Sequence, residues 1–384
     1  NAYPQHYYPL TLLDYANALK EYVKSNKKNF PILSLTVKDY PICDFNCKDC
    51  LVVESRNWAL KNVDKLTFNL KCYKNVLKQI ARYSKLNGFN NVRLEFCGEG
   101  NPDLYKYRKE IVQYANEECN MKIVYISTGS KLLEKDKISL IKNAYFIRIS
   151  FPGIDCETYK RYSNQKTKKQ FEYDDAINLL KELIRLRKEY NRENDLLIGV
   201  RASIRNEFSG KYFEFSKQMD NIGVDCIQFV KMIFYDTPID GNVEIKADLI
   251  NELKFISNLK EYKNIKQIQI PKELDKVYRN RKITNKFDIC FSSLFNPVLY
   301  GNHLIVCTHW HKIMERKYHY GTVCGNKDEI FELLNAEKIK AVQKSIKEEC
   351  TDCCSIYDNT MFKEIYNVLI NYSDIDSLEF KFEK

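Results

Sequence analysis

The chain has 384 residues, 44% of them apolar, which is enough for one large domain and a smaller one, each with its own core. No run approaches the ~18 to 20 consecutive apolar residues that a membrane-spanning helix needs, so we expect a cytoplasmic protein without a membrane partner. The formal net charge of +10 comes from Lys and Arg residues scattered among Asp and Glu. That pattern is typical of a basic, solvated surface, and we do not expect a nucleic-acid partner.

Fourteen cysteines are unusual for a chain of this kind. Without an export signal the thiols should stay reduced, so disulfides explain them poorly. We therefore expect metal or redox chemistry.

The first 30 residues are predicted to form an extension with an amphipathic helix, Leu10 to Val23, packed outside the main domain. From Pro31 onward, short β-rich runs alternate with amphipathic helical stretches, which is typical of a parallel sheet of βα units. The predicted strands are Ile32 to Val37, Val92 to Cys97, Ile123 to Thr128, Phe146 to Phe151, Leu196 to Ile204 and Cys226 to Phe234. The predicted helices between them include Leu70 to Leu86, Leu104 to Cys119, Tyr173 to Tyr190 and Tyr212 to Met219.

Six βα units favour an α/β fold, a partial (β/α)6 TIM-type barrel over residues 31–286, because a full barrel has eight units in about 250 residues. Its chemistry should lie at the C-terminal ends of the strands. From about Phe287 the rhythm stops, cysteines cluster, and a hairpin is expected around Tyr300-Gly301-Asn302. We place a small α+β domain at residues 287–384.

A cysteine triplet follows the first predicted strand. Cys43, Cys47 and Cys50 form a C-x3-C-x2-C pattern in a loop. Three such thiolates can hold a [4Fe-4S] cluster and leave one iron open for a cofactor. A structural zinc is the alternative, but it needs a fourth Cys or His, and none lies within twenty residues on either side.

This triplet, in a loop after the first strand of a six-unit βα barrel, resembles the radical SAM superfamily. The resemblance implies that the open iron binds S-adenosylmethionine, and that one electron, from a donor such as flavodoxin or ferredoxin, cleaves it to a 5′-deoxyadenosyl radical. That radical removes a hydrogen atom from the substrate. Many members carry an aromatic residue before the third cysteine, where this chain has Asp49, so the adenine contacts stay unassigned.

Turns after the next strands also resemble the family. Cys97-Gly98-Glu99 matches the Gly-Gly-Glu motif that holds the methionine amino group, with Cys97 in place of the first glycine. The alternative is an ordinary strand-to-helix connection. Ser127, in Ser-Thr-Gly, matches the family's Thr-Asn-Gly turn.

By the same resemblance, a polar residue after the fourth strand and a following arginine bind the ribose and carboxylate of the cofactor, and Ser150 and Arg161 fit best. A solvated helix surface is the alternative for Arg161. Arg201, on the fifth strand, is a second candidate, because an arginine inside a barrel needs an anionic partner.

Four further cysteines, Cys290, Cys307, Cys350 and Cys353, supply the ligands for one closed [4Fe-4S] cluster. They resemble the twitch subtype of the SPASM auxiliary domain, whose cluster would accept an electron. A structural zinc site that uses His309 or His311 is the alternative.

The remaining cysteines are expected to be small buried apolar residues. Cys156 and Cys324 are the candidates for donating a hydrogen atom to the substrate.

Three functions stay open. The first is modification of a ribosomally made peptide by epimerisation, cross-linking or thioether formation, as many twitch and SPASM relatives do. The second is oxidation of a sugar or cyclitol carbinol, with the auxiliary cluster as electron acceptor. The third, from another class, is a non-catalytic metal-bound scaffold that binds nucleic acid.

Overall fold

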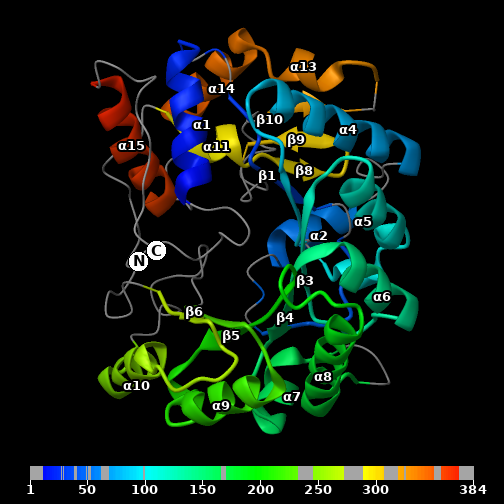
Figure 1. Cartoon of the computed structure of the whole chain (residues 1–384), viewed down its shortest axis with the longest axis vertical. Coiled ribbons are helices and arrows are strands. Elements are labelled where there is room, and N and C mark those ends of the chain that lie inside the picture. Colours follow the sequence, from blue (N-terminus) through cyan, green and yellow to red (C-terminus); the bar gives the residue numbers. More distant parts are fainter. Residues whose placement is uncertain are drawn as a thin grey trace.

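The structure is a computed structural model that describes residues 12–26, 28, 30–38, 41–48, 50, 53–61, 69–97, 100–165, 170–231, 245–271, 289–306, 319–323, 326–349 and 356–371. Its described strands form one ten-stranded sheet in the order β10-β9-β8-β1-β2-β3-β4-β5-β6-β7. Figure 1 shows this sheet curving around a central space, with helices on its outer side.

The six predicted strands are present, parallel and adjacent in chain order. This confirms the α/β class and the partial barrel. They are β1 (Ser34–Val37), β2 (Arg93–Phe96), β3 (Lys122–Ser127), β4 (Ala144–Phe151), β5 (Leu197–Ile204) and β6 (Cys226–Lys231). A short seventh strand, β7 (Gln267–Gln269), adds to β6 in parallel and was not predicted, since three residues of mixed polarity give no clear periodic signal.

Amphipathic helices cover the outer face of the sheet (Figure 1). The helix α8, for example, buries Ile177, Leu180 and Leu183, which recur at three residues, and leaves charged residues outside. The helices of this region are α2 (Val53–Lys61), α4 (Leu70–Leu86), α5 (Arg108–Glu117), α6 (Glu134–Asn143), α7 (Cys156–Ser163), α8 (Tyr173–Glu189), α9 (Tyr212–Ile222) and α10 (Ala247–Asn258). No described helix is both long enough and apolar enough to traverse a lipid bilayer.

The two faces of the sheet differ in character. Outward-pointing residues such as Leu94, Ile147 and Val200 are fully buried in the main core beneath the helices. The alternating residues point inward, where Val124, Ile126 and Phe146 form a separate small apolar cluster with Cys226. Because side chains alternate along a strand, the identity of each inward residue follows from this register.

One predicted helix begins later in the structure than the sequence indicates. Leu104 to Cys119 was expected to be helical, but the α-helix α5 begins only at Arg108, after a 3-10 turn at Pro102–Leu104. The Asn101 side chain caps that turn by accepting a hydrogen bond from the Asp103 amide. Asp103 is then held by groups on β3, so the chain stays at the barrel for several residues before the helix starts.

The C-terminal part extends the same sheet. The predicted hairpin is confirmed: β8 (Val298–Tyr300) and β9 (His303–Ile305) pair antiparallel around Gly301, whose φ is 51°. The strand β8 also pairs in parallel with β1, and β10 (His319–Thr322) pairs with β9. The helices here are α11 (Phe291–Phe295), α13 (Glu329–Leu333), α14 (Ala336–Glu349) and α15 (Ile356–Ile370).

The predicted N-terminal helix is α1 (Leu12–Lys24), and it lies beside α15 outside the barrel (Figure 1). Tyr15 contacts Phe362 with ring centroids 4.9 Å apart, and Tyr22 meets Phe291 edge-on at 6.5 Å. These aromatic contacts bring the two ends of the described chain together in one core.

Candidate active site

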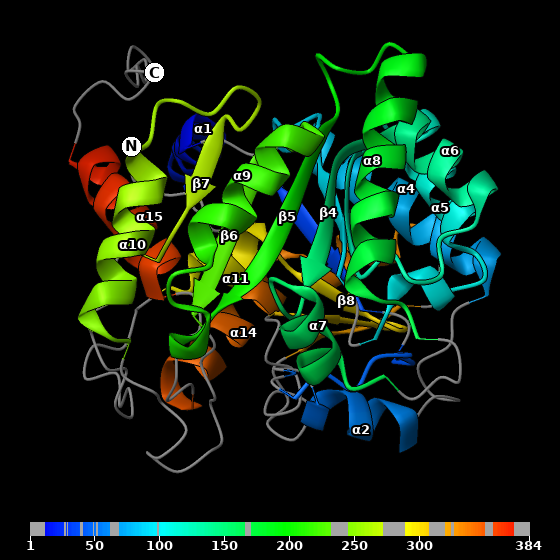
Figure 2. The same ribbon diagram turned by 90° about the horizontal axis from the view of Figure 1, so that it is seen from below.

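The cysteine loop lies where sequence analysis expects the chemistry. It follows β1, and Figure 2 shows α2 and α7, the helices after β1 and β4, at the end toward which the parallel strands point. Cys43, Cys47 and Cys50 are all half-buried, and the Cys50 amide donates a hydrogen bond to the Cys47 carbonyl at 3.2 Å. The loop is thus folded into a turn at the mouth of the barrel.

The turn after β2 holds the start of this loop. The Asn101 amide donates to the Ile42 carbonyl at 2.9 Å. A side chain at Gly100 would overlap that same carbonyl, so only glycine lets the two backbones approach this closely.

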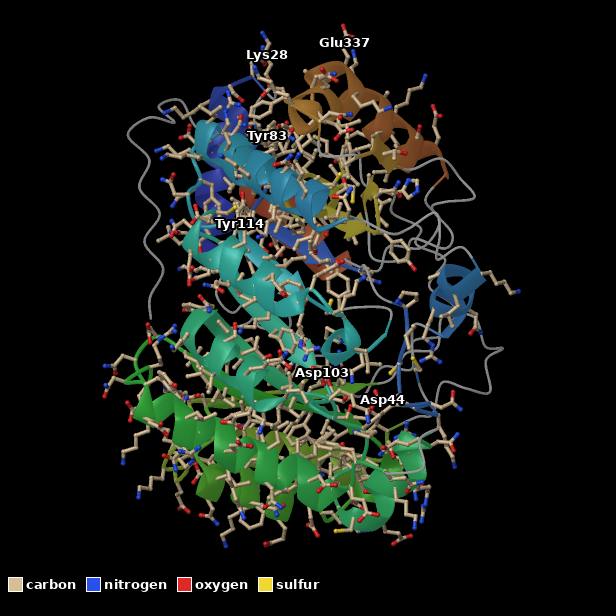
Figure 3. All side chains as sticks on the ribbon, turned by 90° about the vertical axis from the view of Figure 1, so that its right-hand side faces the viewer. Lys28, Asp44, Tyr83, Asp103, Tyr114 and Glu337 are labelled. Atoms are coloured by element: carbon tan, nitrogen blue, oxygen red, sulfur yellow. The ribbon has the colours of Figure 1, made fainter. Side chains whose placement is uncertain are left out.

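A side-chain network then fixes Asp44, between the first two cysteines (Figure 3). Asn101 Nδ2 donates to Asp44 Oδ1 at 3.0 Å, and Ser130 Oγ donates to Asp44 Oδ2 at 2.6 Å. Asn101 Nδ2 also lies 3.0 Å from Thr128 Oγ1 and 2.9 Å from Ser130 Oγ. The loop after β1 is therefore tied to the turns after β2 and β3.

A second buried carboxylate, that of Asp103, supports the turn after β3. Asp103 is 2% exposed and accepts hydrogen bonds from Tyr125 at 2.9 Å and Ser127 at 2.6 Å. Burial raises the pKa of Asp103, against these two hydrogen bonds and the positive charge of Arg108. Ser127 Oγ in turn accepts from the Gly129 amide at 2.6 Å, which sets the turn that carries Thr128 and Ser130.

The helix α7 holds the other side of the loop. The Asn46 amide donates to the Ser163 carbonyl and the Lys48 amide to the Tyr162 carbonyl, each at 3.1 Å. The ring of Phe45 is buried edge-on against Tyr159, 6.3 Å between centroids. The loop is thus clamped from two sides by backbone and side chain.

The three thiols are near enough to influence one another. Burial, opposed by a backbone hydrogen bond, raises the pKa of Cys43 to about 11, and burial together with Cys50 and Cys43 raises that of Cys47 to about 12. The thiols of Cys43 and Cys47 therefore hold their protons more firmly than free thiols do, and iron would displace these protons on binding. Within the described ranges, no three His, Cys, Asp or Glu side chains lie close enough together to hold a single metal ion. A [4Fe-4S] cluster binds each cysteine at a different iron, so the clamped, half-buried triplet fits that group better than one metal ion.

Three of the predicted cofactor contacts lie on or beside the inner face. Cys97 directly follows β2, and Ser150 on β4 pairs in register with Arg201 on β5. Ser127, a fourth, is buried against Asp103, so its hydroxyl is engaged within the protein. Gly98 and Glu99 lie outside the described residues.

Arg161 has a different setting. It lies on α7 with its side chain 43% exposed and forms ion pairs with Glu157 and Glu207, the latter at 3.6 Å. The guanidinium is thus engaged by surface carboxylates in this structure, as the solvated-helix alternative anticipates.

Of the other cysteines that sequence analysis singles out, Cys156 and Cys290 lie in the described part of the chain. Cys156 begins α7 and is exposed, with its Sγ 3.9 Å from Asp174 Oδ1. Cys290 caps α11, and its amide donates to Gln343 Oε1 of α14 at 2.8 Å. Cys307, Cys324, Cys350 and Cys353 lie outside the described residues.

Sequence reasoning missed the residues that position the loop: Asp44, Asn101, Asp103, Thr128 and Ser130. Asn101-Pro102-Asp103 carried a usable signal, because Asn before Pro begins a turn. Nothing in the sequence says that its amide reaches a residue 57 positions away.

No protein-family model matches the chain. A curated protein, the GTPase Obg of Brachyspira hyodysenteriae, is 25% identical over 263 residues. That match covers 67% of this chain and 35% of the relative, so the chain spans about a third of that protein. GTPase is the name of the relative. The present sequence contains no G-x4-G-K-[ST] phosphate-binding pattern.

Solved structures give a broader likeness. Streptococcus suis SuiB bound to S-adenosylmethionine has a TM-score of 0.58 at 14% identity, covering 89% of this chain and 72% of SuiB. The chain has the same partial-barrel fold as SuiB. The same fold is found in anSMEcpe bound to AdoMet and a peptide, at a TM-score of 0.56 and 14% identity, covering 89% of this chain and 98% of that one. SuiB has also been solved with its precursor peptide SuiA, with a TM-score of 0.58 at 16% identity over 85% of this chain and 70% of SuiB.

Proposed function

We propose that the chain is a radical SAM enzyme that binds a [4Fe-4S] cluster through Cys43, Cys47 and Cys50 and modifies a ribosomally made peptide. One observation carries the proposal: the three thiols lie together at the mouth of a partial barrel whose fold SuiB shares, in a loop clamped by Asn101 and Ser130.

When bound, such a cluster would supply an electron to S-adenosylmethionine, and the resulting 5′-deoxyadenosyl radical would take a hydrogen atom from the substrate. The three cysteines would hold the iron. Asp44 and Asn101 would keep the loop in place, and the main-chain contacts of Asn46 and Lys48 would hold its other side against α7.

Residues at the strand ends would bind S-adenosylmethionine. Glu99 supplies a carboxylate for the methionine ammonium, beside Cys97 and Gly98, while Ser150 supplies a hydroxyl on the inner face. Ser127 would shape the adjoining turn through its bond from the Gly129 amide. Arg161 would reach the cofactor carboxylate only by leaving its surface partners.

An auxiliary [4Fe-4S] cluster on Cys290, Cys307, Cys350 and Cys353 belongs to the same proposal, in a C-terminal twitch-like domain from about residue 287. Two described features support it. Cys290 is joined to α14, the helix that leads to Cys350, and β9 leads to Cys307. The strand β9 pairs with β10, which contacts α14, so the elements that precede these cysteines belong to one packed unit. The cluster would accept an electron from the substrate.

The peptide substrate rests on the neighbours. SuiB and anSMEcpe, which share the barrel, have both been solved with peptides. A flavodoxin or ferredoxin would supply the first electron, and Cys156 or Cys324 could return a hydrogen atom if the product is an epimer. A cytoplasmic location would suit such reduced thiols.

Iron content tests the cluster assignments. After anaerobic reconstitution we expect about eight irons per chain, falling to about four in a Cys43, Cys47, Cys50 triple alanine variant. About four irons in the parent and none in the variant would remove the auxiliary cluster from the proposal. Equal iron in both proteins would remove the first cluster.

Turnover tests the activity. With dithionite and S-adenosylmethionine the reconstituted parent should release 5′-deoxyadenosine, and the Cys47→Ala variant should not. A parent that binds about eight irons and forms no 5′-deoxyadenosine would favour the non-catalytic scaffold. Formation that rises with a cyclitol or aminoglycoside, and with no peptide, would favour carbinol oxidation.

A further inference from the structure

The inside of the barrel contains an excess of positive charge. Arg148 on β4 and Arg201 on β5 both point inward, as the register of the two strands requires. Arg93 on β2 shares that face, where its Nε donates to Ser34 Oγ at 2.9 Å and its Nη2 lies 3.4 Å from Glu95 Oε2. In the middle of the described inner face of β1–β6, three guanidinium groups thus meet the single carboxylate of Glu95.

Arg148 and Arg201 are incompletely paired. Arg148 donates to Gln228 Oε1 at 2.6 Å, but its buried Nε has no hydrogen-bond partner in the described part of the chain. Arg201 forms no hydrogen bond or ion pair with any described residue; only the more distant charges of Glu95 and Cys97 favour its cation. Burial and the repulsion of Arg148 lower the pKa of Arg201 to about 10. A guanidinium so placed costs free energy unless an anion joins it.

Water reaches these side chains from within the barrel. Arg148, Ser150 and Arg201 are half-buried, whereas their outward neighbours Ile149 and Val200 are fully buried. Beside Arg148 the packing is tight: a side chain at its register partner Gly199 would overlap Cys226 Sγ and Phe146. The two arginines are therefore partly exposed on the inner face, next to the small apolar cluster of Val124, Ile126, Phe146 and Cys226.

We propose that Arg148, Arg201 and Gln228 bind a carboxylate of the substrate inside the barrel, so that the peptide carries an aspartate or glutamate at or next to the residue that reacts. That the ligand is a peptide substrate rests on the proposed function. That it carries a carboxylate rests on the arginines of the inner face. Gln228 pairs in register with Arg201 and accepts from Arg148, so it joins the two guanidinium groups into one recognition surface.

The methionine carboxylate of S-adenosylmethionine is the other source of this chemistry, and charge argues against it. That cofactor carries an ammonium and a sulfonium beside its one carboxylate and is a net cation. Two guanidinium groups that no described carboxylate pairs with would repel it, whereas an acidic substrate would neutralise them. The cysteine loop is also docked on the turns after β2 and β3, while the two arginines project from β4 and β5 below their C-terminal ends.

The test uses N-acetyl-glutamate amide as the acidic probe and N-acetyl-glutamine amide as its neutral counterpart. Titration calorimetry on the full chain, before and after iron reconstitution, measures binding of both probes and of S-adenosylmethionine. We expect saturable binding of the acidic probe only, weakened about tenfold or more in Arg201→Gln and in Arg148→Gln, since each loses a charge-assisted contact. Arg201→Lys should keep part of the affinity. Arg185→Gln, on the exposed face of α8, should bind like the parent.

Thermal melting adds a readout that a structural role would not give. Without probe, Arg201→Gln should melt at or above the temperature of the parent, because it removes a half-buried positive charge that is repelled by Arg148 and pairs with no described residue. With probe, the parent should gain more stability than the variant. A lower melting temperature of the ligand-free variant would make Arg201 a structural residue and overturn the proposal.

Two further results would also overturn it. One is an acidic probe that binds the parent and both glutamine variants equally, or does not bind at all. The other is a loss of S-adenosylmethionine affinity in Arg201→Gln that matches or exceeds the loss for the probe, which would assign the arginines to the cofactor. A chain that binds the probe through these arginines without cleaving S-adenosylmethionine would refute the proposed enzyme while leaving the carboxylate site.

Discussion

Asn101 Nδ2 lies 3.0 Å from Asp44 Oδ1 and joins the turn after β2 to the middle of the cysteine loop. Both residues are buried, at 2% and 8% exposure. The same amide group also contacts hydroxyls on the turn after β3. One side chain thus coordinates three loops at the mouth of the barrel, and the position of the thiols depends on it.

Replacing Asn101 with leucine should lower the free energy of unfolding by about 2–4 kcal/mol, because it leaves a buried carboxylate short of a donor. It should also lower the iron bound after reconstitution, since Cys43 and Cys47 flank Asp44. Denaturant titration and iron analysis measure the two effects. Asn116→Ala on α5, whose amide makes one long bond of 3.4 Å to Met121, is the matched control. Full iron content in Asn101→Leu would show that the loop holds its shape without this contact.

Gly100→Ala should displace the cysteine loop, because the added methyl group overlaps the Ile42 carbonyl, a rigid backbone group. We expect reduced iron content even where the variant folds. Gly210→Ala is the control: the space there is open, and only the φ of +82° is unfavourable, at a cost of about 1–2 kcal/mol. Comparable iron loss in both variants would point to general destabilisation instead of a local clash.

Asp103 should make stability depend on pH. Its folded pKa is raised by burial above the unfolded value of about 3.9, so its stabilising contribution is complete below that value and is lost as the pH rises through the folded pKa. Relative to Asp103→Asn, the parent should therefore lose free energy of unfolding as the pH increases from about 4. Denaturant titrations across this range measure the difference.

Asp155 supplies a control of opposite sign. Burial acts to raise its pKa, but hydrogen bonds from Lys211 and Thr158 prevail and lower it. Its contribution to the free energy of unfolding should be present above the unfolded pKa and lost as the pH falls through the lowered folded value.

For Asp103, a difference in free energy of unfolding between the parent and Asp103→Asn that stays constant with pH would contradict the prediction. It would mean that Asp103 titrates alike in the folded and unfolded states.

Arg161→Ala should change the free energy of unfolding by less than about 1 kcal/mol, because its ion pairs with Glu157 and Glu207 are exposed. A fall in S-adenosylmethionine affinity in this variant would then report contact with the cofactor. Arg185→Ala breaks a matched i,i+4 pair with Glu189 on α8 and should leave affinity unchanged. If both variants bind the cofactor like the parent, Arg161 is a surface residue.

The sequence by itself determined the barrel and the cysteine triplet. Both are local properties. The alternation of strand and helix patterns can be recognised within short segments of the sequence, and the spacing of Cys43, Cys47 and Cys50 can be read without knowledge of the fold. The hairpin at Gly301 belongs to the same class, since its turn depends on adjacent residues.

Only the tertiary structure decided which distant residues meet. Ser130 reaches Asp44 across 86 positions, and no periodicity encodes that contact. Strand register decided that Arg148 and Arg201 share the inner face, because a shift of one residue would have turned either side chain outward. The orientation of α7 likewise directed Arg161 toward Glu207, a choice made by packing between separate helices and loops.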